Sequence, residues 1–258
     1  MLDPLAKPEV KVAGSDEQRS ANFRYAVGLP WVRPMGEPHR PRSTSIAIVG
    51  YAPSLLETYS EIREFAFVLS TSGAHTFLLD RNIIPTWHHD IEPRGHKAKM
   101  LGAPMPLIQY ILSSDAAPAL YQRLRGYDVR RINVINPRYP ELLRAVPRGE
   151  WCIRSCGGVG GNAIALARFL GFTDLHLFGI DGSVASDGAT HAAIHPNARK
   201  EVPEPCEYEG RTFLTTPGFL YQAQSILRLK VMLADTSFTF HGDGLLQHMA
   251  KTAPPWPM

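Results

Sequence analysis

The sequence predicts an α/β fold, in which a mostly parallel sheet carries helices on both faces to form three layers. Short apolar runs alternate with segments of helical period along the chain, as they do in repeated strand–helix units. Gly50 and Gly179 each follow an apolar run, where a buried parallel strand would end. A glycine-rich stretch, 156–161, separates another strand-like run from a helical one. Together these features favour a Rossmann-like arrangement.

The chain is expected to divide into a lead-in and one elaborated domain. Residues 1–42 are rich in proline, charge and small polar residues, so they are expected to form an N-terminal arm. The domain, residues 43–258, opens with the apolar run 45–49. Ser54 and Glu57 then have the spacing of a capping box that starts a helix. This is the first predicted strand–helix unit.

Further strands and helices are expected along the rest of the domain. Strand-like runs cover 65–69, 107–112, 131–135, 151–154, 175–178 and 238–240, and helical patterns cover 74–80, 116–124, 162–170 and 217–233. Residues 182–216 interrupt the alternation with polar, proline-rich sequence and a hairpin pattern around Glu209-Gly210. Insertions of this length in compact domains are usually lids or binding loops. Residues 254–257 are expected to form a tail.

Composition disfavours several classes of protein. The chain has 258 residues, of which 44% are hydrophobic and 20% charged, as in a soluble globular protein. No apolar run is long enough to cross a membrane and the first residues lack a secretory pattern, so we expect a cytoplasmic protein with no membrane partner. The net charge of +3 is dispersed, which disfavours a nucleic-acid partner. The three cysteines lack C-x-x-C spacing, which favours reduced thiols over a zinc site.

Two glycine-containing turns are candidate phosphate sites. In the first turn, Gly50, Pro53 and Ser54 could hold a phosphate or ribose, and a turn glycine followed by a helix-capping serine is an equal alternative. The second turn precedes a helix, whose N-terminus would attract an anion, and its candidate residues are Gly157, Gly158, Gly160 and Asn162. Neither turn has the G-x-G-x-x-G or P-loop pattern, so an ordinary NAD enzyme or P-loop ATPase is disfavoured.

Other polar residues follow strands on the same expected edge of the sheet. Ser72 and Gly73 are candidates for binding a nucleotide sugar or base, although such serines are commonly helix caps. Asp90 and Asp181 are candidate catalytic residues and Mg²⁺ ligands, because Mg²⁺ that bridges phosphates needs only one or two carboxylates. A solvated loop-end charge is the alternative for Asp90. His191 is a candidate general base, with a solvated surface histidine as the alternative.

Several short motifs occur in order between residues 45 and 195. They are Gly50-x-x-Pro53-Ser54-Leu55, Ile84-Pro85 followed by Asp90, Gly157 to Asn162, and Leu170-Gly171 to Gly179-x-Asp181 with Asp187-Gly188-x-x-His191. In this order they resemble the DUF115 family, the 6-hydroxymethylpterin diphosphokinase MptE-like proteins, which include motility accessory factor (Maf) glycosyltransferase-like proteins. The first turn and the later Gly-x-Asp pattern are also similar to bacterial sialyltransferases that use a CMP-sugar donor.

The resemblance implies a Rossmann-like transferase fold that handles a nucleotide phosphate. Carried over, the Gly50 to Ser54 turn would line the nucleotide. Asp90 and Asp181 would face the phosphates or a Mg²⁺ ion, and His191 would lie at the edge of the pocket. Tyr51 stands where many members of the family have a small or polar residue, so the contact with the nucleotide need not be the same here.

Three functions fit these residues. The first is a Mg²⁺-dependent, diphosphokinase-like transferase that passes a diphosphate from ATP to a small hydroxymethyl acceptor such as a pterin. The second is a glycosyltransferase that uses a nucleotide sugar, with His191 or His88 as the base. The third is a nucleotide-binding module without turnover. The paired acidic residues favour the first. The partners are small molecules in each case, and the sequence leaves open the acceptor and whether the chain forms a homo-oligomer.

Overall fold

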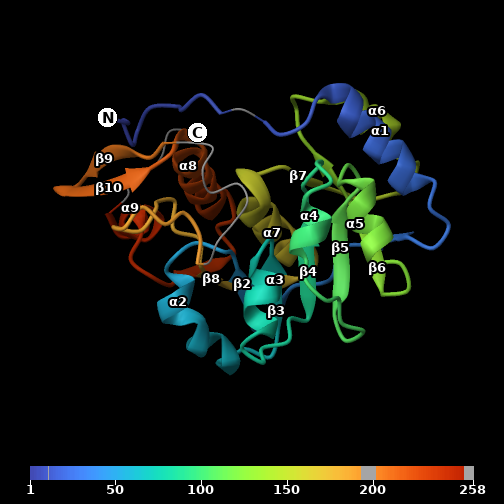
Figure 1. Cartoon of the computed structure of the whole chain (residues 1–258), viewed down its shortest axis with the longest axis horizontal. Coiled ribbons are helices and arrows are strands. Elements are labelled where there is room, and N and C mark those ends of the chain that lie inside the picture. The colour runs from blue at the N-terminus through green and yellow to red at the C-terminus, as the bar shows by residue number, and fades with distance from the viewer. Residues whose placement is uncertain (11, 193–201, 253–258) are drawn as a thin grey trace.

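A computed structural model describes residues 1–10, 12–192 and 202–252 of the protein. They form a three-layer α/β fold, which confirms the predicted fold class (Figure 1). The strands of the main sheet are β1 Arg33–Pro34, β2 Arg42–Val49, β3 Val68–Thr71, β4 Trp87–Asp90, β5 Gln109–Ser113, β6 Val129–Ile135, β7 Cys152–Arg154, β8 Phe172–Phe178 and β11 Ser237–Phe240. Every pairing among them is parallel.

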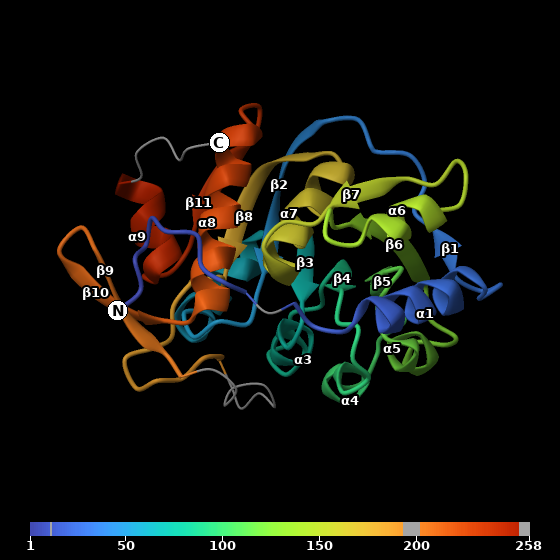
Figure 2. The same ribbon diagram turned by 90° about the horizontal axis from the view of Figure 1, so that it is seen from above.

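Helices cover both faces of this sheet. They are α1 Asp16–Val27, α2 Leu55–Thr58 with the 3-10 helix η1 Tyr59–Glu64, α3 Ala74–Leu79, α4 Lys97–Met100, α5 Pro118–Arg123, α6 Pro140–Ala145, α7 Gly158–Phe169, α8 Pro217–Met232 and α9 Leu245–Thr252. Figures 1 and 2 show α3, α4 and α5 on one face of the sheet and α7 and α8 on the other.

Strand β2 shows why the sequence forms a sheet that is buried on both faces. Ile46 and Ile48 pack in the core that α7 and α8 share with the sheet. Ala47 and Val49 pack in a second core with residues of α2 and α3 on the opposite face. None of the four side chains is exposed. A strand covered on both sides needs a continuous apolar run rather than an alternating one, as the sequence predicts here.

The order of the strands reverses at β2. Along the sheet the order is β1, β6, β5, β4, β3, β2, β8 and β11, with β7 also paired to β6. The chain therefore builds outward from β2 in one direction and then returns to place β8 on its other side. Parallel strands have their carboxyl ends at one edge, and open α/β sheets bind ligands at such a reversal. The turns after β2 and β8 are thus the first place to look for a site.

The N-terminal segment contains a helix that the sequence analysis did not predict. Helix α1 begins after Ser15, whose hydroxyl accepts a hydrogen bond from the Gln18 backbone N at 3.2 Å. Asp16 and Glu17 lie in its first turn, where acidic side chains favour a helix. Proline-rich flanking sequence obscured this capping signal. Phe23 on α1 is buried against α6.

The residues before α1 also lie against the protein. The Leu2 backbone N donates to the Pro205 carbonyl at 2.8 Å. The Gln224 side chain on α8 donates to the carbonyls of Pro4 and Ala6, both at 2.8 Å. Figure 1 shows the first residues of the chain, in blue, beginning near β9. The predicted arm is therefore docked onto the domain.

The 182–216 insertion contains the predicted hairpin. Strands β9 Glu204–Tyr208 and β10 Arg211–Thr215 pair antiparallel in a separate sheet, and Glu209 and Gly210 both adopt positive φ at its turn. Residues 193–201 of the insertion and the predicted tail at 254–257 lie outside the described residues. Within the described part of the chain, no helix combines the length and apolar character needed to cross a bilayer.

Candidate functional site at the strand reversal

The turns after β2 and β8 are in direct backbone contact. The Gly50 N donates to the Phe178 carbonyl, and the Ala52 N donates to the Gly179 carbonyl, both at 2.8 Å. A Cβ on Gly50 would lie 2.4 Å from the Gly179 carbonyl oxygen, and Gly179 itself has a φ of 57°. Glycine is required at both positions because the two backbones approach too closely for a side chain. This contact fixes the predicted nucleotide turn at the strand reversal.

Ser54 binds Asp181 instead of capping α2. Its backbone N lies 2.9 Å from Asp181 Oδ2, and its hydroxyl donates to Oδ1 at 2.5 Å. The Ser54 side chain accepts no capping hydrogen bond, so the predicted capping box is wrong although α2 begins where expected. Ser54 also has helical backbone angles, φ −59° and ψ −16°, instead of the extended conformation that is typical of a capping residue. Ser54 and Asp181, which are 127 positions apart in sequence, therefore hold the two turns together.

Asp181 is enclosed by the protein. Only 4% of the residue is exposed, and burial raises the pKa of its carboxyl while the hydrogen bonds from Ser54 oppose that rise. A Cβ on Gly244 would lie 2.6 Å from the Asp181 Cβ, and one on Gly242 would lie 2.7 Å from the Ser54 hydroxyl. The Leu246 N donates to the Asp181 carbonyl at 2.8 Å. Through its side chain and its backbone carbonyl, Asp181 thus ties the Gly50 turn to the start of α9.

The glycine-rich turn before α7 closes on itself. Gly157 and Gly158 both have left-handed φ values, 56° and 80°. The Asn162 side chain accepts a hydrogen bond from the Cys156 backbone N at 2.7 Å. Gly161 packs against the Cys156 carbonyl with no room for a Cβ. Asn162 and Gly161 therefore shape the turn from inside, and Asn162 is fully buried.

The same turn also packs against α8. A Cβ on Gly157 would lie 2.5 Å from the Ser225 Cβ, and one on Gly160 would lie 3.2 Å from Gln222 Nε2. Gly157 and Gly160 are buried, whereas Gly158 is exposed. Of the four candidate residues at this turn, Gly158 is therefore the one that faces outward at the N-terminus of α7, and the other three support the turn by packing.

Tyr51 connects three segments at the carboxyl edge. A Cβ on Gly73 would lie 2.4 Å from the Tyr51 ring, so the ring lies directly on the turn after β3. The Tyr51 and His191 ring centroids are 5.8 Å apart. The Tyr51 carbonyl also accepts a hydrogen bond from the Ala192 N at 3.0 Å. Ser72, in the same turn as Gly73, has a φ of 52°, which is rare for a residue with a side chain.

Asp90 is buried and lies beside a lysine that the sequence analysis did not select. Its Oδ1 accepts hydrogen bonds from the backbone N of Ile91 at 2.8 Å and of Glu92 at 3.0 Å. Its Oδ2 lies 3.9 Å from Lys97 Nζ. Lys97 Nζ donates in turn to the Ser72 hydroxyl. Asp90 is 3% exposed and Lys97 6% exposed, so a solvated loop-end charge does not describe Asp90.

His191 is half-buried at the same edge. Its Nδ1 lies 2.9 Å from the Thr190 hydroxyl. Burial lowers the pKa of His191 to about 4, and the positive charge of Lys97 adds to this effect. The imidazole is therefore neutral at pH 7 and free to accept a proton, although a pKa this far below the working pH makes it a weak base. Half-burial against Tyr51 also distinguishes it from a solvated surface histidine.

His88, the other candidate base, belongs to a buried histidine cluster. His75, His88 and His89 have no exposed surface. His88 Nδ1 lies 3.1 Å from the Ser70 hydroxyl, and His75 Nε2 lies 3.1 Å from the Tyr110 hydroxyl. Burial lowers the pKa of all three histidines, that of His75 to about 4. These neutral rings lie beneath the carboxyl edge rather than on it.

The structure does not bring Asp90 and Asp181 together. Asp90 ends β4 and Asp181 follows β8, and β3 and β2 lie between those strands. Neighbouring strands are about 4.8 Å apart, so the ends of β4 and β8, which carry the two carboxylates, are separated by roughly 14 Å. Ligands of one Mg²⁺ ion each lie about 2 Å from it. Among the described residues, no group of three or more His, Cys, Asp or Glu side chains is placed to hold a metal ion.

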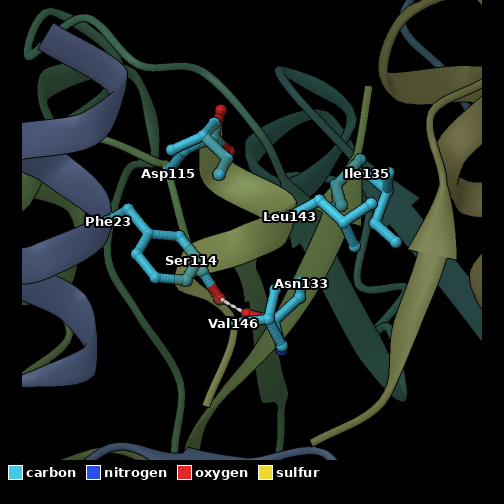
Figure 3. Close-up of a pocket in the computed structure, with 9 residues that line it drawn as sticks. Phe23, Ser114, Asp115, Asn133, Ile135, Leu143 and Val146 are labelled. Carbon is cyan, nitrogen blue, oxygen red and sulfur yellow. Dashed lines mark hydrogen bonds between the residues drawn. The ribbon is translucent and has the colours of Figure 1, made fainter. Parts of the chain in front are cut away.

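A separate pocket lies at the ends of β5 and β6, beneath α1 and α6 (Figure 3). Its polar side chains bind one another. The Ser114 hydroxyl donates to Asn133 Oδ1 at 2.6 Å, and the Asp115 carboxylate pairs with Arg19 on α1. Because β5 lies three strands from β2, this pocket is distinct from the strand reversal, and its internal hydrogen bonds fit a role in attaching α1.

In structural comparisons the similarity lies in the fold. The Maf glycosyltransferase from Magnetospirillum magneticum AMB-1 superposes with a TM-score of 0.65 and 18% identity, over 90% of this chain and 38% of that one. This chain thus spans less than half the length of that protein. A mammalian sialyltransferase in complex with Gal-beta-1-3GalNAc-ortho-nitrophenol aligns over 94% of this chain and 93% of its own at 11% identity, with a TM-score of only 0.42. No curated protein matches the sequence.

A family model gives a more specific assignment. The model described as 6-hydroxymethylpterin diphosphokinase MptE-like matches residues 30–187, which is more than half of the chain. The matched segment contains both turns of the strand reversal, the α7 turn, Asp90 and Lys97, and it ends before His191. This match supports a transferase-like role. The chain belongs to the MptE-like family.

Proposed function

We propose that the protein is a nucleotide-dependent transferase that moves a diphosphate from ATP to a small hydroxymethyl acceptor, such as a pterin. The observation that carries this proposal is the strand reversal between β2 and β8 in a chain of the MptE-like family. The Gly50 to Ser54 turn, which Asp181 holds in place, lies at this edge. The exposed Gly158 at the N-terminus of α7 adds a backbone amide suited to a phosphate oxygen.

A Mg²⁺ ion shared by Asp90 and Asp181 does not fit the residues present. Asp181 accepts two hydrogen bonds from Ser54, and Asp90 accepts two from backbone amides beside the Lys97 cation. The two carboxylates also lie on different strands, far apart. We therefore propose only a Mg²⁺ ion that arrives bound to the nucleotide phosphates and that keeps several of its water ligands.

Within this proposal, His191 is the base. The acceptor hydroxyl oxygen attacks the β-phosphorus of ATP, the bond from that phosphorus to the α–β bridging oxygen breaks, and AMP leaves. The hydroxyl proton passes to the neutral imidazole of His191. Phosphoryl transfer depends mainly on positioning and charge neutralisation, so the turns at the strand reversal would contribute most by fixing the phosphates.

We expect the full chain, given ATP, Mg²⁺ and 6-hydroxymethylpterin, to produce AMP and the diphosphorylated pterin in equal amounts. His191→Gln should lower the rate by about 10²-fold or more, because it removes the base. His39→Gln changes an exposed histidine and should have no effect. Mass spectrometry of both products tests this. AMP formation at the same rate in His191→Gln would remove the assigned role, and no product from the wild type would contradict diphosphate transfer.

Glycosyl transfer from a nucleotide sugar is the second candidate, and the pairing of Asp90 with Lys97 favours it. A buried lysine can neutralise the charge that develops on a leaving nucleotide phosphate without a metal ion. In that reaction His191 would deprotonate the acceptor hydroxyl. Binding of CMP or a CMP-sugar that persists in EDTA, with no product in the pterin assay, would favour this second function. A module that binds nucleotide without turnover would show binding alone.

A further inference from the structure

Lys97 is a buried cation that uses little of its hydrogen-bonding capacity. A lysine ammonium has three N–H donors. Among the described residues, the Ser72 hydroxyl accepts one hydrogen bond from it. Asp90 Oδ2, at 3.9 Å, lies beyond hydrogen-bond distance. Buried ammonium groups are costly unless acceptors surround them, so the arrangement leaves room for a further acceptor.

Asp90 attracts the Lys97 ammonium electrostatically but accepts no hydrogen bond from it. The Asp90 Oδ1 is occupied by the backbone amides of Ile91 and Glu92. Its remaining oxygen attracts the Lys97 charge at 3.9 Å without accepting a hydrogen bond. Asp90 is therefore a positioning residue. It balances the charge in the free protein and directs the ammonium toward Ser72.

Lys97 Nζ lies near the strand reversal. Lys97 lies at the start of α4. Its contact, Ser72, begins the turn after β3, the strand next to β2. Ser72, Tyr51 and His191 are half-buried, so the amine lies just beneath the surface at the edge where the nucleotide is proposed to bind. The left-handed backbone of Ser72 accompanies this contact.

We propose that Lys97 Nζ and the Ser72 hydroxyl together bind a phosphoryl group of the nucleotide donor. This inference rests on the proposed function and deepens it. The ammonium is a compact charge that suits phosphate oxygens. The hydroxyl can accept from Lys97 and donate to the same phosphoryl group. In this proposal the nucleotide contacts three elements: the turn after β2, the turn after β3 and helix α4.

The test is the affinity of the full chain for ATP, CMP and inorganic diphosphate, measured by isothermal titration calorimetry. Lys97→Met removes the charge and keeps the length of the side chain. We expect it to weaken ATP and diphosphate binding at least tenfold, with a smaller loss for CMP, which has one phosphate. Lys99→Met changes an exposed lysine on the same helix and should stay within twofold of the wild type.

A double variant separates ligand binding from folding. Lys97→Met alone leaves Asp90 without its counter-charge, so its melting temperature should fall. Asp90→Asn combined with Lys97→Met removes both charges and should recover much of that loss while affinity for diphosphate stays low. Recovery of affinity in the double variant, or wild-type affinity in Lys97→Met, would overturn the inference. If Lys97→Met binds and transfers normally, this inference fails and glycosyl transfer loses the support of the Asp90–Lys97 pair, but diphosphate transfer does not fail. If the wild type binds none of the three ligands, the proposed function fails as well.

Discussion

Gly161→Ala should destabilise the protein by about 3 kcal/mol or more, at the upper end of what overpacking costs. A Cβ at this position would lie 1.6 Å from the Cys156 carbonyl oxygen. That oxygen belongs to backbone that cannot rotate away, because the Cys156 amide is bound to Asn162 within the same turn. The substitution would force the start of α7 away from β7 and disturb the core that α7 shares with the sheet. Urea unfolding followed by circular dichroism measures the loss.

Gly160→Ala is the matched control for this prediction. Gly160 is the adjacent residue, in the same helical turn, and a Cβ there would lie 3.2 Å from the end of the flexible Gln222 side chain. Alanine also favours a helix over glycine by about 1 kcal/mol, which offsets a small clash. We expect a change within about 1 kcal/mol. Equal losses of stability in the two variants would show that the close packing of Gly161 on Cys156 is not the cause of the destabilisation.

Acid should destabilise the protein because its buried histidines are neutral when it is folded. The pKa of His75 is about 4 in the folded protein, below the ordinary histidine value of 6.5. Between these two pH values the unfolded chain binds more protons, so the free energy of unfolding falls as the pH falls through this window. His75 alone accounts for about 3 kcal/mol of that loss. Burial also lowers the pKa of the neighbouring His88 well below its ordinary value, so His88 adds to this loss.

The slope of stability with pH identifies the residues responsible. His75→Gln keeps a polar group near the Tyr110 hydroxyl but cannot take up a proton, so its free energy of unfolding should fall less steeply between pH 7 and pH 4.5. His39→Gln alters an exposed histidine and should reproduce the wild-type slope. Denaturant titrations at several pH values give these slopes. An unchanged slope in His75→Gln would mean that acid destabilises the protein through other groups.

Much of the fold follows from local patterns in the sequence. Most strands of the central sheet overlap predicted apolar runs, whereas β1 and β4 are not apolar runs. The hairpin at Glu209-Gly210 lies where its turn residues predict. The sequence patterns do not predict α1, α4, α6 or α9. The signal of α1, a capping serine followed by two acidic residues, lies within a segment whose overall composition is typical of an arm. Local capping chemistry was the better guide there than average composition.

The sequence predicts the sheet edge at which the candidate residues lie but not their contacts. Glycines at strand ends correctly indicate the carboxyl edge near Gly50. The pairing of Ser54 with Asp181 depends on which strands are neighbours, and the sequence does not reveal that order. Sheet order also separates Asp90 from Asp181. Lys97 looks like Lys99 in the sequence, and only packing against Ser72 distinguishes the buried lysine from the exposed one.

The central claim is that a nucleotide binds at the strand reversal, and hydrogen–deuterium exchange with and without ATP and Mg²⁺ tests it most directly. We expect ATP to slow exchange in three segments: residues 50–55 after β2, 72–74 after β3, and 157–160 at the start of α7. Residues 114–116, beside the pocket at β5 and β6, should be unchanged. Slower exchange confined to residues 114–116, or no change anywhere at saturating ATP, would contradict the account.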